Sequence, residues 1–276
     1  MTVSRDDRGA PHPLWGVQGS EITSGTPGRW SGVTNRLGRW TAGAAGDPVR
    51  AQLTGAAGGA TGRLLGASTR WAAEHALPAV CCARRTSEPV VALTFDDGPH
   101  PQLTDAVLDV LAAHGAAATF FVIGDRVDGN ERVVARIVDR GHELGNHLMS
   151  DEASIRLSHD RFVGDLTRNH DLLLPYQDVS FWRPGSGWMT PWMVRAAAAH
   201  GERCALGTVA IADGPPPEPG SWRERRLLSQ IGAGAVVVLH EGTAERSDVV
   251  DTTDWLLTRM AERGLRSVTM SALAKL

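Results

Sequence analysis

From Val90 onward, short apolar runs alternate with longer amphipathic runs, and this alternation constrains the fold more than any other feature of the chain. The amphipathic runs have the length of helices, and several end at a glycine, such as Gly115, Gly141 and Gly201. Strands that alternate with helices form a parallel sheet covered by the helices. The pattern predicts strands over residues 90–94, 118–123, 142–147, 180–183, 203–209, 235–240 and 267–270, and helices over 103–114, 131–140, 161–174, 191–200, 222–231 and 249–263.

Seven strands alternating with six helices in so short a stretch fit a (β/α)7 barrel better than a long open sheet. In barrels of this kind, the active site lies at the carboxyl ends of the strands. Residues 1–88 are rich in glycine and lack a sustained period, so they predict a flexible or partly helical N-terminal arm before a domain over residues 89–276. The alternative for this arm is a basic, tryptophan-containing segment (Trp30, Trp40 and Trp71) that contacts a membrane surface or a partner.

Charge and hydropathy exclude several classes of protein. The net charge of −3 shows no basic excess, which argues against a nucleic-acid partner. The longest apolar run, Ile231–Leu239, is far too short for a membrane span. The first residues lack the apolar region of a secretion signal, and the three cysteines form no disulfide framework, so we expect a cytoplasmic protein. The oligomeric state stays open.

Polar side chains follow most of the predicted strands at the point where each strand ends. They are Asp96 and Asp97 after the first strand, His147 and Asp151 after the third, Arg183 after the fourth, Asp213 beyond the fifth and His240 at the end of the sixth. In a barrel, all of these positions face one mouth.

Two adjacent carboxylates repel each other unless a cation compensates one of them. Asp151 follows His147 by four residues, so a helical turn after His147 would place both side chains on one face. Together with Asp97 they predict three ligands for one divalent metal ion. Three protein ligands with open positions are typical of catalytic zinc, which activates a bound water.

The remaining polar residues fit general acid–base chemistry. Asp96 is positioned to accept a proton from the water, His240 to protonate a leaving nitrogen, and Arg183 to keep Asp96 ionised and oriented. Each feature alone also has a structural interpretation, because Asp-Asp-Gly-Pro is a good turn and a single histidine is often only hydrogen-bonded. Their coincidence at one end of the predicted barrel favours catalysis.

Four segments resemble the motifs of the polysaccharide deacetylases, also known as NodB-homology or carbohydrate esterase family 4 proteins. The segments are T-F-D-D-G-P-H at 94–100, G-H-E-L-G-N-H at 141–147, F-W-R-P-G-S-G-W at 181–188 and V-L-H at 238–240, and the resemblance covers about residues 89–273. It implies a distorted (β/α)7 barrel of the NodB-homology type. It also implies that Asp96 is the catalytic base and that Asp97 and His147 are metal ligands.

The resemblance extends to further roles. It implies that the backbone N–H at Ser186 holds the oxyanion, that Asp213 tunes the acid His240, and that Leu239 lines the pocket for the acyl group. Trp188 is either a core or rim aromatic or part of a platform for a sugar ring.

One position departs from the family pattern. Most members carry a second histidine where this chain has Asp151. A carboxylate makes the site harder and more anionic, so Co²⁺, Mn²⁺ and Ni²⁺ become alternatives to the expected Zn²⁺.

The function predicted from these motifs is metal-dependent hydrolysis of an N-acyl group, expected to be N-acetyl, on an amino sugar or related carbohydrate. A first alternative keeps the fold and the metal but acts on another small amide, such as a cyclic imide or a ureide, as allantoinase does. A second alternative is a non-catalytic carbohydrate-binding relative, which the departure at Asp151 favours.

Overall fold

The computed structural model describes residues 79–276. Its strands are β1 (Val80–Cys81), β2 (Val90–Gly98), β3 (Thr119–Val122), β4 (Glu143–Asn146), β5 (Phe181–Trp182), β6 (Arg203–Ala205), β7 (Val209–Ala210), β8 (Val236–His240) and β9 (Arg266–Val268). Its helices are α2 (Leu103–Ala113), α3 (Glu131–Asp139), α4 (His159–Leu173), α5 (Pro191–Ala199), α6 (Trp222–Leu228), α7 (Val249–Glu262) and α8 (Met270–Ala274). The predicted helices and strands are therefore found close to their expected positions.

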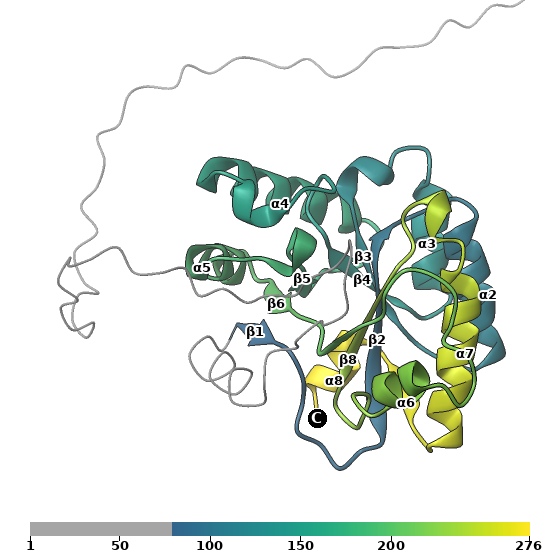
Figure 1. Cartoon of the computed structure of the whole chain (residues 1–276). Helices are drawn as coiled ribbons and strands as arrows, with labels where there is room; N and C mark the ends of the chain where they lie inside the picture. Colours follow the sequence, from purple (N-terminus) through teal and green to yellow (C-terminus); the bar gives the residue numbers. More distant parts are fainter. Residues whose placement is uncertain (1–78) are drawn as a thin grey trace, which may run out of the picture. The chain divides into compact units, whose positions relative to one another are not determined.

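The strands form one parallel sheet that curls into a barrel, as predicted (Figure 1). The order is β1-β6-β5-β4-β3-β2-β8-β7, and β9 also pairs with β2. Only three residues separate β6, which is next to the end strand β1, from β7 at the other end of this order. Where we expected a single strand over 203–209, β6 pairs with β5 while β7 pairs with β8. The segment between them bends at Thr208 and contains Gly207, where an added Cβ would lie 2.3 Å from Val238 Cγ2.

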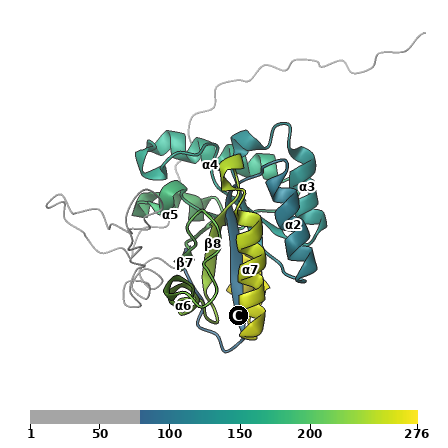
Figure 2. The same cartoon turned by 45° about the vertical axis from the view of Figure 1, so that its right-hand side comes forward.

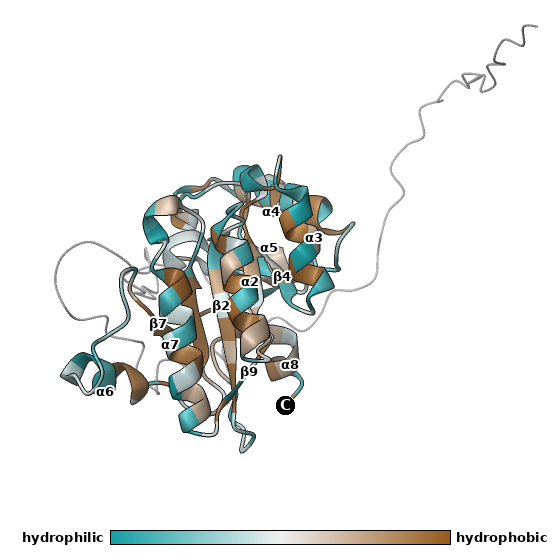
Figure 3. Cartoon of the chain, turned by 90° about the vertical axis from the view of Figure 1, so that its right-hand side faces the viewer, coloured by the Kyte–Doolittle hydropathy of each residue, from teal (hydrophilic) through white to brown (hydrophobic). Residues whose placement is uncertain are grey.

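Two apolar clusters pack on the two faces of β2, and a third lies between α4 and α5. One lies between the sheet and helices α2 and α7, where the rings of Phe95 and Phe120 stack with their centroids 4.9 Å apart. The other fills the inside of the curl and contains Phe121, Val236 and Met270. Figures 2 and 3 show α7 and α2 running along β2, whose residues are mostly apolar. Because side chains alternate along β2, Phe95 packs in the helix-covered layer, while Thr94 and Asp96 face the other way.

Two local features differ from the predicted elements. The expected strand over 267–270 ends at Val268, because the Thr269 side chain accepts a hydrogen bond from Ala272 N (3.2 Å) and begins α8 instead. Strand β1 lies within the segment expected to be the arm, and its pairing with β6 adds Val80 and Cys81 to the sheet. The rest of that expected arm, residues 1–78 with Trp30, Trp40 and Trp71, lies outside the described residues.

Within residues 79–276, no helix combines the length and apolar character that a membrane span requires.

Candidate active site

The carboxyl ends of β2, β4, β5 and β8 bring predicted site residues together. Asp96 on β2 is in register with His240 on β8, and β4 and β5 end directly before His147 and Arg183. Asp96, His147 and Arg183 are buried, and His240 is partly exposed. The predicted convergence at one end of the barrel is therefore present for these residues.

Arg183 and Asp96 form a buried ion pair. Arg183 Nη1 donates to Asp96 Oδ1 (2.6 Å) and to Thr94 Oγ1 (2.7 Å). Arg183 Nε donates to the Ala205 carbonyl (3.0 Å), and its guanidinium lies 4.0 Å from the centre of the Phe121 ring. A charge-assisted bond between buried partners is short and strongly directional. Asp96 is thus held in one orientation, with only one of its oxygens used by Arg183.

Asp97 and His147 form a second buried pair next to the first. His147 Nε2 lies 3.1 Å from Asp97 Oδ1, and Nδ1 donates to the Arg183 carbonyl (2.8 Å). Burial by itself would raise the pKa of Asp97, but the hydrogen bonds from His147 and Arg246 hold it well below its usual range. Burial would likewise lower the pKa of His147, but Asp97 and Asp96 raise it above its usual value.

The geometry of Asp97 and His147 fits a shared divalent cation. Two atoms that bind the same tetrahedral zinc ion lie about 3.3 Å apart, given bonds of about 2.0–2.1 Å. Oδ1 and Nε2 are close to that separation, and the carbonyl bond at Nδ1 fixes the ring in the way metal-binding histidines require. In this structure, the guanidinium of Arg246 contacts the other oxygen of Asp97.

Asp151 does not join Asp97 and His147. The helical turn expected after His147 is wrong, because the chain bends at Leu148, whose φ is +63°. The Asp151 side chain is 57% exposed, and its Oδ2 lies 3.4 Å from Arg126 Nη2. Among the described residues, one set of three potential ligands has all donor atoms within 4.8 Å of one another, and it lies elsewhere. The role of Asp151 as third ligand stays a prediction that requires its carboxylate to turn towards Asp97.

His240 and Asp213 form a third pair on the opposite side of Asp96. His240 Nδ1 lies 3.2 Å from Asp213 Oδ1, the contact that the resemblance implied. The hydrogen bond from His240 lowers the pKa of Asp213. Burial would lower the pKa of His240, but the bond to Asp213 and the charge of Asp96 raise it above its usual value. The two residues, with Leu239 and Arg246, line a small open pocket.

The segment after Arg183 carries two more predicted residues. Ser186 is exposed and has a left-handed backbone (φ +60°), and Trp188 is partly buried. Gly185 packs so closely that an added Cβ would lie 2.2 Å from the Glu152 carbonyl oxygen. This contact joins the loop of Ser186 to the loop that follows Asp151, and the roles of Ser186 and Trp188 stay predictions.

The sequence analysis missed two arginines in the site. Arg246 contacts Asp97 and also places Nε 3.2 Å from Asp213 Oδ2. Arg126 bonds the Asp97 carbonyl as well as Asp151. Both arginines lie in short turns outside the motifs, so no spacing rule points to them.

Glu241 was also missed, although it directly follows His240. It is fully buried, and burial raises its pKa to about 8. Its Oε2 accepts a hydrogen bond from Thr104 Oγ1 (2.5 Å), and its Oε1 would lie 2.1 Å from a Cβ at Gly98. Glu241 therefore packs against the end of β2, next to Asp97.

Gly242→Ala is expected to disturb the end of β2 that carries Asp97. A Cβ at Gly242 would lie 1.9 Å from the Asp97 carbonyl oxygen, a backbone atom that only a shift of the chain can move away. We expect a loss of about 1–3 kcal/mol in the free energy of unfolding, measured by urea denaturation. Gly232→Ala is the matched control, because nothing lies within 4 Å of its added Cβ. Equal stability of the two variants would contradict this packing.

Comparison with known proteins agrees with this geometry. Residues 83–205 match the family model for polysaccharide deacetylase. A chitooligosaccharide deacetylase from Sinorhizobium fredii is 33% identical over 160 residues, which cover 57% of this chain and 74% of that protein. The chain belongs to the polysaccharide deacetylase family. The resemblance found in the motifs is thereby confirmed.

Further members of the polysaccharide deacetylase family match more of the chain. A peptidoglycan-N-acetylglucosamine deacetylase from Bacillus cereus is 29% identical over 197 residues, 68% of this chain and 90% of the relative. A crystal structure of a peptidoglycan N-acetylglucosamine deacetylase superposes with a TM-score of 0.64 at 25% identity, over 71% of this chain and 92% of that chain. A mutant of a CE4-family pseudoenzyme with restored enzymatic activity superposes with a TM-score of 0.60 at 26% identity, over 71% of each chain.

Proposed function

We propose that this chain is a metal-dependent N-deacetylase that acts on an acetylated amino sugar within a carbohydrate. One observation carries the proposal: Asp96 is bound by Arg183, is followed directly by Asp97 in contact with His147, and is in register with His240 on the neighbouring strand. The relatives support the substrate class, since they are named as deacetylases of chitooligosaccharides and of peptidoglycan.

The proposed metal site uses Asp97 and His147, with Asp151 as the third ligand after its carboxylate turns inward. A divalent ion bound there supplies a polarised carbonyl and a water of lowered pKa. Zn²⁺ is the proposed ion, with Co²⁺, Mn²⁺ or Ni²⁺ as the alternatives that a carboxylate-rich site allows. Asp96 accepts the proton of the attacking water, and the bond from Arg183 keeps Asp96 ionised and aimed.

In the second half of the proposed reaction, the carbonyl oxygen is stabilised and the leaving nitrogen is protonated. As water oxygen bonds to the acetyl carbon, the backbone N–H of Ser186 is the proposed donor to the carbonyl oxygen. The carbon–nitrogen bond then breaks, and His240 gives its proton to the sugar nitrogen, leaving acetate and a free amine. Leu239 is the proposed wall of the acetyl pocket, and Trp188 the proposed contact for the sugar ring.

The test is release of acetate from defined substrates. The purified protein with added Zn²⁺ is incubated with chitooligosaccharides, with peptidoglycan fragments, and with allantoin and cyclic imides. We expect release of acetate and a free amine from the chitooligosaccharides, the peptidoglycan fragments or both. We expect no ring opening of allantoin or the cyclic imides. Hydrolysis of the cyclic amides alone would replace this proposal with the first alternative. The cytoplasmic location is part of the proposal and is tested separately by cell fractionation.

Asp213→Asn is expected to shift the pH profile. The bond to Asp213 raises the pKa of His240, and His240 must be protonated to act as the acid. Without this partner, His240 loses its proton at lower pH, so the alkaline limb of kcat/KM moves to lower pH. The profile is measured by acetate release, with Asp254→Asn, whose partner is the remote His114, as control. An unmoved alkaline limb would contradict the role of His240.

A second candidate function is carbohydrate binding without turnover. Two observations favour it: Arg246 contacts Asp97, and Asp151 points to Arg126. In that case, calorimetry would detect binding of a chitooligosaccharide, while no acetate would be released with any of the four metals.

A further inference from the structure

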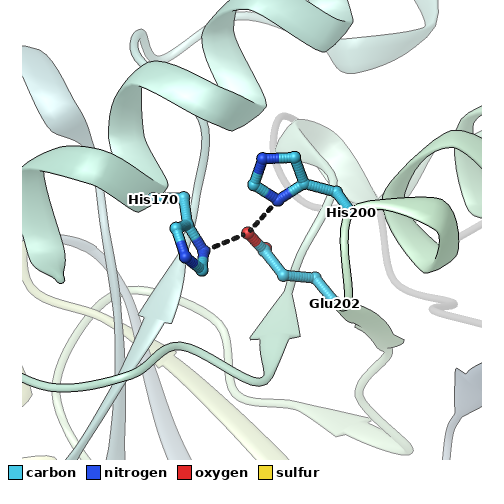
Figure 4. Close-up of side chains that lie close together, drawn as sticks. All are labelled: His170, His200 and Glu202. Atoms are coloured by element: carbon cyan, nitrogen blue, oxygen red, sulfur yellow. Dashed lines mark hydrogen bonds and ion pairs between the residues drawn. The ribbon is translucent and has the colours of Figure 1, made fainter.

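A second cluster of ligand-type side chains lies between α4 and α5, away from the candidate active site. His170 is in the last turn of α4, His200 directly follows α5, and Glu202 directly precedes β6 (Figure 4). The two helices pack through apolar residues such as Phe162 and Met193. The cluster thus lies where the ends of two packed helices meet the start of a strand.

Both imidazole rings place a nitrogen close to the same oxygen, Oε1 of Glu202. His170 Nδ1 lies 2.9 Å and His200 Nδ1 3.6 Å from Glu202 Oε1, and all three donor atoms lie within 4.8 Å of one another. The rings meet edge to face, with centroids 4.9 Å apart. Ligands of one tetrahedral zinc ion have donor atoms about 3.3 Å apart, so these separations are those of a ligand set with little rearrangement.

The hydrogen bonding of the cluster is incomplete. Glu202 is fully buried, and its Oε1 accepts from Asn146 Nδ2 (3.1 Å). Within residues 79–276, neither Glu202 Oε2 nor His200 Nδ1 has a hydrogen-bond partner. A buried carboxylate needs a proton or a cation, and a metal ion bound by Glu202 and His200 would supply the cation and a partner for His200 Nδ1.

We propose that His170, His200 and Glu202 bind a divalent transition-metal ion, with Zn²⁺ as the reference ion, and that this ion ties the end of α4 to the turn between α5 and β6. Two nitrogens and one oxygen suit zinc and its neighbours better than Mg²⁺ or Ca²⁺, which take oxygen ligands. The imidazole side chains are 15% and 26% exposed, which leaves an approach for the ion and for a water as fourth ligand.

This site is separate from the candidate active site, although the two are connected through β4. Asn146 and His147 are neighbours, but their side chains point to opposite sides, Asn146 to Glu202 and His147 to Asp97. The proposal therefore does not rest on the proposed function. An ion here has a structural role, because none of its ligands contacts the residues around Asp96.

The experiment measures bound zinc in a variant that lacks one of the proposed metal ligands of the active site. The full chain carrying Asp97→Asn is dialysed against low Zn²⁺, and bound zinc is measured by mass spectrometry. We expect one equivalent of zinc in this variant, and none after adding either His200→Gln or Glu202→Gln. His159→Gln, on the same helix and beside Asp160, is the matched control and should keep the ion.

A second readout is thermal unfolding of the same proteins. Added Zn²⁺ should raise Tm in the Asp97→Asn protein and in its His159→Gln derivative, because an ion that binds only the folded state stabilises it. It should not raise Tm once His200 or Glu202 is replaced. Absence of zinc from the Asp97→Asn protein would overturn the proposal, as would zinc binding and a Tm shift that survive both replacements.

Discussion

Asp96→Asn is expected to lower kcat/KM by about a hundredfold to ten-thousandfold. The amide keeps the shape of the side chain and can still accept the bond from Arg183 Nη1, but it cannot take a proton from water. General-base catalysis contributes about this factor in enzymes. Acetate release from a chitooligosaccharide, measured at saturating metal, gives the rate. Bound metal should stay unchanged, because Asp97 rather than Asp96 is the proposed ligand.

The control for this variant is Asp109→Asn. Asp109 forms an exposed ion pair with Arg140 on the outer helices, and such pairs contribute little. Its kcat/KM should equal that of the wild type. If Asp96→Asn folds, binds metal and keeps more than a tenth of the wild-type rate, another group acts as the base.

Removal of the metal is expected to reduce activity to the background of the assay. Without an ion, Asp97 and His147 pair with each other and no group polarises the acetyl carbonyl. Exhaustive chelation followed by dialysis should abolish acetate release, and one equivalent of Zn²⁺ at the active site should restore it. Co²⁺, Mn²⁺ and Ni²⁺ are compared in the same way, because Asp151 in place of histidine changes the donor set.

The two proposed ions make a control necessary for this experiment. Glu202→Gln removes a ligand only from the site between α4 and α5. This variant should therefore bind one equivalent of zinc less than the wild type, while its deacetylase activity should still depend on added metal. Asp97→Asn should show no activity with any of the four metals. Undiminished turnover after complete removal of metal would exclude the proposed chemistry, whatever the outcome at the second site.

Much of the fold was predictable because it depends on local pattern. The alternation after Val90 predicted the strands and helices, and parallel strands connected by helices allow few topologies. The exceptions follow from tertiary contacts. The division at Gly207 arises because one segment must pair with β5 and then with β8, and the start of α8 depends on a cap at Thr269.

The sequence by itself determined that Asp96, Asp97, His147, Arg183 and His240 meet, because each lies at the end of a strand and the ends of parallel strands share one edge. Only the tertiary structure decided what compensates their charges. Arg126 and Arg246 come from turns whose direction no local period specifies, and Asp151 turns to Arg126 because the chain bends at Leu148. The cluster at Glu202 likewise exists only because two helix ends pack together.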